Sequence, residues 1–145
     1  MGVLGRRGLL TGAAALGMFG TAQAAGKAFR IDVHHHITPP SWLAAVKKVG
    51  LDTPPMANWS VEKSLEDMEK GGIATAMTSP TTPQLGFLPA AEAATIARES
   101  NEYARKVAND HPGRFGLFAM LQMPHVDECM SWIGSSTIRL RWRMR

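Results

Sequence analysis

The sequence predicts an α/β fold, in which the strands of one sheet alternate with helices. Three short apolar stretches have the length and composition of strands, and stretches with helical periodicity lie between them. The resulting order of strand, helices, strand, helix and strand favours a parallel sheet with right-handed crossover connections. The first strand also ends in a His-x-His pair, so potential metal ligands stand at the carboxyl end of a strand.

The first predicted strand covers residues 29–36 and ends in His34-His35-His36. Side chains two positions apart on a strand point to the same side, so His34 and His36 can converge on one divalent metal ion. Imidazole is a common ligand for zinc, iron and nickel. His35 is expected to point the other way, where it packs or donates a hydrogen bond near the site.

A short helix is predicted directly after the first strand. Ser41 is expected to cap a helix over residues 42–49, and Gly50 is expected to end it. Residues 51–58 contain two adjacent prolines and are predicted to form a loop.

A second helix and a second strand follow. Ser60 is expected to cap the helix, in which apolar residues recur at helical spacing, and Gly71-Gly72 is expected to stop it. Residues 73–79 are then predicted to form the second strand, which Pro80 ends.

A long helix over residues 90–110 separates the second and third strands. Its small, apolar face is suited to packing on a sheet; it consists of Ala93, Ile96, Ala97, Ser100, Ala104 and Val107. Residues 114–121 are predicted to form a third strand, mostly apolar as a parallel strand buried on both faces should be. Pro124 and Asp127 are suited to the start of a further helix.

These elements match the beginning of a (β/α)8 TIM-type barrel, whose active sites lie at the carboxyl ends of the strands. Such a barrel needs about 250 residues, whereas this chain has 145. The sequence therefore predicts the N-terminal part of a barrel, truncated after about three strands.

Residues 1–24 have the pattern of an export signal. Arg6-Arg7 precede a short apolar run, and Ala22-Gln23-Ala24 offers small residues for cleavage. The paired arginines resemble a bacterial twin-arginine signal, although an ordinary secretory signal has the same overall pattern. We expect an exported, periplasmic or secreted protein that meets the membrane only during export.

The positive formal charge of +4 comes from the two ends of the chain. Without the six arginines of the leader and of the last seven residues, ten basic residues face twelve acidic ones. No nucleic-acid motif is present, so no nucleic-acid partner is expected. Cys129 is the single cysteine, which excludes an internal disulfide and a cysteine-based zinc site; a small buried residue is its expected role.

The blocks that follow the first strand carry a family resemblance. The first block is residues 31–40. The others are Gly72-Ile73 leading to Ser79-Pro80, Asn101-Glu102-Tyr103, and residues 110–116 with Phe118-Ala119, and together the blocks span about residues 29–130. In this order and spacing the chain resembles the metal-dependent amidohydrolase superfamily, in its branch related to aminocarboxymuconate-semialdehyde decarboxylase. We therefore interpret residues 25–130 as the N-terminal portion of such a barrel.

The resemblance implies a function and a site. His34 and His36 correspond to the metal-binding His-x-His of that family, with a divalent metal, usually Zn²⁺. The remaining ligands and the catalytic acid or base are expected from later strands, so the catalytic residues are unknown here. The implied reaction is non-oxidative decarboxylation of a small carboxylated aromatic or dienoic molecule, and the full-length protein is expected to be able to form a homo-oligomer.

Two other functions stay open from the sequence. Related enzymes hydrolyse amide, ester or lactone bonds on the same fold, and the residues present do not separate the two chemistries. A truncated barrel can also be non-catalytic, because it leaves an apolar sheet edge unpaired. The Arg-rich residues 131–145 depart from the family pattern, and we interpret them as an aberrant tail from out-of-frame translation.

Overall fold

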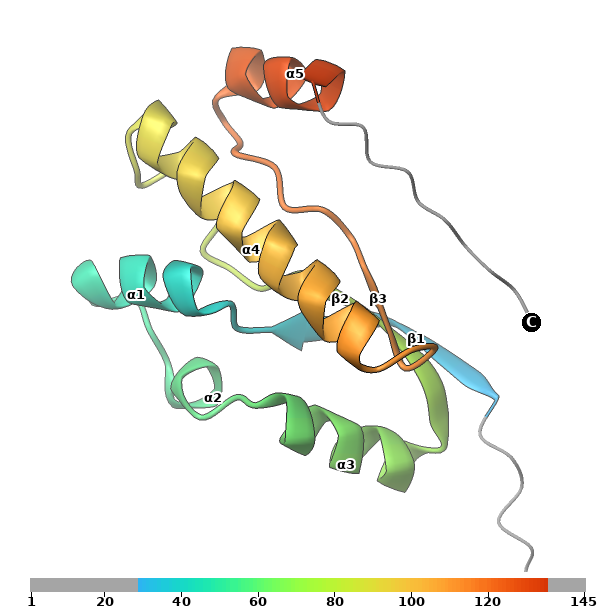
Figure 1. Cartoon of the computed structure of the whole chain (residues 1–145). Coiled ribbons are helices and arrows are strands. Elements are labelled where there is room, and N and C mark those ends of the chain that lie inside the picture. Colours follow the sequence, from blue (N-terminus) through green and yellow to red (C-terminus); the bar gives the residue numbers. More distant parts are fainter. Residues whose placement is uncertain (1–28, 136–145) are drawn as a thin grey trace, which may run out of the picture.

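The computed structural model describes residues 29–135 of the chain (Figure 1). The predicted export signal lies outside the described residues, as does most of the predicted aberrant tail, so both stay predictions. The backbone of residues 131–135 belongs to a helix that begins before them. None of the helices in the described range is long and apolar enough to cross a membrane.

Three parallel strands form the sheet, in the order β1-β2-β3. β1 covers Arg30–Ile37, β2 covers Ile73–Pro80 and β3 covers Phe115–Leu117. This confirms the predicted α/β class and the parallel pairing. Each strand is joined to the next through helices, which lie beside the sheet (Figure 1).

The third strand is shorter than the predicted range of 114–121. Its pairing with β2 runs from Phe115 to Leu117, and the N–H of Phe118 still donates to the carbonyl oxygen of Thr78. β2 ends two residues later at Pro80, which has no N–H to offer. The apolar residues that follow Leu117 therefore have no further part of β2 to pair with, and the strand ends before the apolar sequence does.

Five helices complete the described part of the chain; they are α1 (Pro40–Lys48), α2 (Pro54–Ala57), α3 (Val61–Gly71), α4 (Ala90–Asp110) and α5 (Val126–Ser135). The long helix α4 has the predicted bounds. The predicted loop over residues 51–58 was wrong in part, because it contains α2, which begins at two prolines. Proline is well suited to the first turn of a helix, where its missing N–H costs nothing.

The helix boundaries test the capping predictions. Ser60 caps α3, since its Oγ accepts the backbone N–H of Lys63 at 3.2 Å. Gly72 ends that helix in the left-handed region, with φ of 62°, which glycine adopts without strain. The predicted cap at Ser41 was wrong: α1 begins at Pro40, two residues before the predicted start, with Pro39 in the capping position and no side-chain cap.

One face of the sheet is covered by α3 and α4. Met68 of α3 and Val107 of α4 pack with Ala76 of β2 and Phe115 of β3 in a buried cluster. A second cluster joins α1 to α4 around the fully buried Trp42. On β1, by contrast, the large apolar side chains of Ile31 and Val33 are 65% and 66% exposed.

Asn101 ties the segment after β3 to α4. Its Nδ2 donates to the carbonyl oxygen of Met120 at 2.9 Å, and its Oδ1 accepts the N–H of Met120 at 2.7 Å. Asn101 belongs to one of the sequence blocks that resemble the amidohydrolase family. The two bonds satisfy both backbone groups of a residue that has left the sheet.

We predict that Asn101→Ala lowers the free energy of unfolding by about 1–3 kcal/mol, because it leaves two backbone groups of buried Met120 without their partner. Urea unfolding followed by circular dichroism measures the change. Asn109→Ala is the matched control on the same helix, since Asn109 is exposed, and it should change stability by less than about 0.5 kcal/mol. Equal effects of the two variants would show that the Asn101 bonds do not stabilise the fold.

Candidate metal centre on the first strand

The pairing of β1 with β2 is irregular just before the histidines. Asp32 pairs with Ala76 and His35 pairs with Thr78, so Val33 and His34 of β1 together face Met77 of β2. Two residues against one is a β-bulge, a feature that re-aims side chains. The exposure of the side chains follows it: Val33 and His34 are both exposed, although they are consecutive.

The bulge places His34 and His36 together. Both side chains are exposed, and their rings meet edge to face with centroids 4.8 Å apart. His35 lies between them in sequence but is half-buried, and it contacts Ser64 of α3 instead. The structure thus brings the two predicted ligands together and separates His35 from them, as expected for each.

A backbone carbonyl orients the ring of His36. Its Nδ1 lies 3.2 Å from the carbonyl oxygen of Ser79, the residue that pairs with it on β2. A carbonyl oxygen only accepts, so this bond requires the proton on Nδ1 and leaves the Nε2 lone pair free. Metal-bound histidines in proteins show this arrangement, with one ring nitrogen held by an acceptor and the other on the metal.

Asp32 supports the bulge from within the same strand. Its Oδ1 accepts the backbone N–H of His34 at 2.9 Å, and its Oδ2 lies 3.2 Å from Nδ1 of His35. The N–H of His34 and the ring of His35 hold the pKa of the Asp32 carboxyl below its ordinary value, although partial burial acts in the opposite direction. Asp32 is therefore an anion that accepts hydrogen bonds from two neighbouring residues.

The pair His34 and His36 fits two ligands of a divalent cation. Imidazole nitrogens suit zinc and its neighbours among the transition metals, and a chelating pair needs the two rings on one side of the strand. Within residues 29–135 no group of three or more His, Cys, Asp or Glu side chains is placed to hold a metal.

Other residues of types that often serve in sites have structural roles here. Trp42 is fully buried and donates from Nε1 to the carbonyl oxygen of Pro83, so core packing is its role. Cys129 is buried, as expected, beside the sulfur of Met123. His111 follows the last residue of α4 at its C-cap, and Nε2 of His125 bonds the carbonyl oxygen of Leu88.

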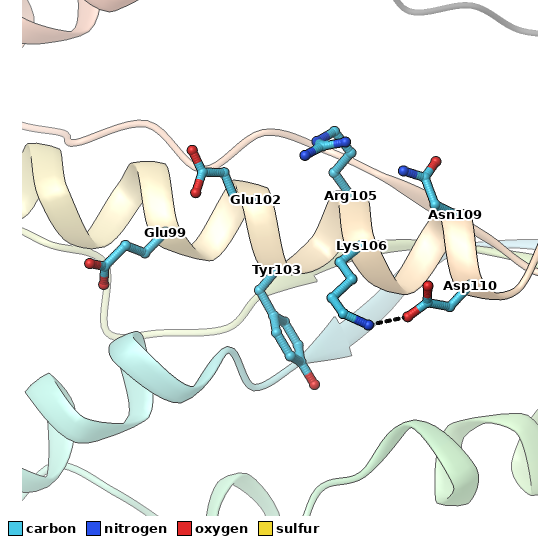
Figure 2. Close-up of a pocket in the computed structure, with 7 residues that line it drawn as sticks. All are labelled: Glu99, Glu102, Tyr103, Arg105, Lys106, Asn109 and Asp110. Carbon is cyan, nitrogen blue, oxygen red and sulfur yellow. Dashed lines mark hydrogen bonds and ion pairs between the residues drawn. The ribbon is translucent and has the colours of Figure 1, made fainter.

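The polar outer side of α4 forms a shallow depression (Figure 2). Glu102 and Arg105 are exposed there, and Lys106 pairs with Asp110 one turn later. Tyr103 also borders the depression, and its ring meets that of Trp59 edge to face, with centroids 6.4 Å apart. Burial raises the pKa of the Tyr103 hydroxyl. A solvated helix face, without converging catalytic groups, accounts for the remaining residues.

Ser64 lies near the site and was not predicted from the sequence to have a role there. Nε1 of Trp59 donates to Oγ of Ser64 at 3.0 Å, and that Oγ lies 3.0 Å from Nε2 of His35. Ser64 is 3% exposed. The sequence places Ser64 on the apolar side of an otherwise polar helix. This position could have predicted its role, since a buried hydroxyl needs a hydrogen-bond partner.

Comparison with known proteins supports a relation to decarboxylases, although no family model matches the chain. The chain is 44% identical over 102 residues to the decarboxylase yanB of Aspergillus niger, a match that covers 67% of this chain and 27% of that protein. It is 33% identical over 96 residues to the 6-methylsalicylic acid decarboxylase of Penicillium expansum, covering 62% of this chain and 29% of that protein. The chain thus spans less than a third of the length of these relatives.

Solved structures share the fold. An amidohydrolase II structure aligns with a TM-score of 0.66 at 24% identity, covering 72% of this chain and 35% of that chain. The dihydroxybenzoic acid decarboxylase of Polaromonas sp. JS666, solved with manganese and the inhibitor 2-nitroresorcinol, aligns with a TM-score of 0.59 at 19% identity, covering 72% and 33%. These matches show that the described part of the chain shares its fold with part of these two proteins.

The hydrogen bonds predict the position of the ring proton on two histidines. His36 and His35 should both carry the proton on Nδ1, because Ser79 and Asp32 offer only acceptors to that atom. Long-range ¹⁵N–¹H correlation spectra of the chain at neutral pH distinguish the two tautomers. A proton on Nε2 of His36 would contradict the proposed free lone pair on that nitrogen.

Proposed function

We propose that this chain, which is similar to fungal decarboxylases and shares the fold of amidohydrolases, forms the first metal-binding segment of a non-oxidative decarboxylase. The observation that carries the proposal is the His34–His36 pair, with its rings 4.8 Å apart on an exposed face of β1. The overall similarity to decarboxylases supports the choice of reaction.

In this proposal β1, β2 and β3 are consecutive strands of a (β/α)8 barrel. Their parallel order, and the helices α3 and α4 on one face, agree with that architecture. The face that carries His34, His36, Ile31 and Val33 then lines the barrel interior. The further ligands and the acid or base would come from strands that correspond to the unmatched part of the relatives.

A divalent cation held by His34 and His36 would act as a Lewis acid toward oxygen atoms of the substrate. We propose Zn²⁺ as that cation, because two imidazoles are typical zinc ligands. Manganese in the Polaromonas enzyme supports the wider proposal of a divalent metal. His36 is the better defined ligand of the two, since the carbonyl oxygen of Ser79 accepts from its Nδ1 and leaves Nε2 free for the cation.

The proposed substrate is a small benzoic acid with a hydroxyl group next to the carboxylate. Both 6-methylsalicylic acid and 2,6-dihydroxybenzoate, named for relatives and for solved structures, have this pattern. In the reaction the bond to the carboxyl carbon breaks, carbon dioxide leaves, and the ring carbon keeps the electron pair and takes up a proton. No oxidant or reductant is required.

Removing either ligand should abolish metal binding by the chain. We predict measurable Zn²⁺ binding by the wild-type chain in competition with a chromophoric chelator, and none by His34→Ala or His36→Ala. Two imidazoles chelate one ion, and a single imidazole does not. His125→Ala is the matched control, because that histidine lies in the loop before α5 and bonds a backbone carbonyl. Loss of binding in the His125→Ala control as well would contradict the assignment of the metal site to β1.

The reaction itself is tested in a chimera. Residues 29–130 of this chain replace the matched segment of the Penicillium expansum 6-methylsalicylic acid decarboxylase, and release of carbon dioxide from 6-methylsalicylate is measured. We expect activity, and a loss of at least about 100-fold in the His36→Ala chimera, since a metal contributes several kcal/mol to such a reaction. A chimera that cleaves an ester or lactone but releases no carbon dioxide would favour the hydrolase function instead.

A further inference from the structure

A chain of hydrogen bonds connects the helix layer to the bulge of β1. Nε1 of Trp59 lies 3.0 Å from Oγ of Ser64, Ser64 Oγ lies 3.0 Å from Nε2 of His35, and Nδ1 of His35 lies 3.2 Å from Oδ2 of Asp32. The other oxygen of Asp32 accepts the backbone N–H of His34. We call these four side chains, from Trp59, Ser64, His35 and Asp32, the relay.

The donors and acceptors of the relay match in one direction. Trp59 can only donate and the Asp32 carboxylate can only accept. The Ser64 hydroxyl therefore accepts from Trp59 and donates to Nε2 of a neutral His35, whose Nδ1–H donates to Asp32. Each polar group in the relay then has a partner, so reversing any one bond leaves another group unsatisfied.

The relay ends on the backbone at the point where the strand pairing is interrupted. Val33 and His34 face Met77 in the bulge, and β1 is paired on one side only among the described residues. The Asp32 carboxylate thus supplies the hydrogen bond that the neighbouring strand does not give to His34. The direction of the His34 side chain depends on this backbone geometry.

We infer that Asp32, His35, Ser64 and Trp59 are positioning residues, which fix the bulge and thereby aim His34 and His36 at one cation. This inference rests on the proposed metal-binding function. The anchor is firm because Ser64 is 3% exposed and belongs to α3, whose start is capped at Ser60. The hydrogen bonds of the relay thus fix the position of the β1 backbone relative to α3, and with it the positions of the side chains on the exposed face of β1.

The same side chains have the connectivity of a Ser-His-Asp triad, which suggests a nucleophile as the competing function. A nucleophilic hydroxyl must be reachable by substrate and must have a free lone pair. Ser64 is buried, and the indole N–H of Trp59 already occupies its oxygen. The geometry therefore favours positioning over attack by Ser64.

The test measures the Zn²⁺ affinity of the whole chain in two serine variants. Ser64→Ala should weaken binding at least about tenfold, the usual cost of losing a group that orients a metal ligand. Ser100→Ala is the matched control: it is also a buried helix serine, but its Oγ has no hydrogen-bond partner among the described residues. It should change the affinity by less than about twofold. NMR resonances of the His34 and His36 rings should shift in Ser64→Ala alone.

Thermal melts of both variants establish that they fold. If Ser64→Ala does not fold, Trp59→Phe provides the same test. Trp59→Phe keeps an aromatic ring and removes the N–H donor, so it should also weaken binding and shift both rings. Unchanged affinity and unchanged ring resonances in the folded variant would overturn the inference, while the loss of binding in His36→Ala would leave the proposed function intact. A wild-type chain without Zn²⁺ binding would overturn both.

Discussion

The bulge in β1 is the constraint on which the candidate site depends. An extra residue opposite Met77 shifts the alternation of the strand by one position. Up to the first bulge residue, Val33, the exposed positions are Ile31 and Val33, and from the second bulge residue, His34, they are His34 and His36. Without the shift the two histidines would share a face with Asp32, which instead contacts His35 on the side covered by helices.

The sequence was sufficient for the layout of the fold, because that layout depends on local patterns. The buried side of α4 was predicted from its small residues, and the ends of α3 from Ser60 and Gly72. Where a predicted helix or strand boundary was wrong, the difference came from a hydrogen-bond partner far away in the sequence or from a proline. The segment after β3 was predicted as strand, but the backbone of Met120 bonds Asn101, nineteen positions away.

The pairing of His34 with His36 was predicted from the period of a regular strand, and the rings do meet. The strand is not regular, however, and the prediction holds because the bulge ends before His35 and leaves the last positions alternating normally. What could not be predicted is the support of the pair. Ser79, Ser64 and Trp59 reach the site through contacts across 43, 29 and five positions, in a combination that no local pattern specifies.

The distribution of polar and apolar groups on β1 explains why its two faces have different roles. On the covered face, Asp32 and His35 are costly to bury unless every donor finds an acceptor, and the relay to Ser64 and Trp59 provides these partners. On the exposed face, His34 and His36 stand beside Ile31 and Val33, which are apolar. Covering this face, as the proposed barrel does, would remove water from the apolar side chains and leave the imidazole nitrogens to be satisfied by a cation. In the proposed barrel, the burial that stabilises the fold would also strengthen the interaction of His34 and His36 with a metal ion, because electrostatic attraction grows as water is excluded.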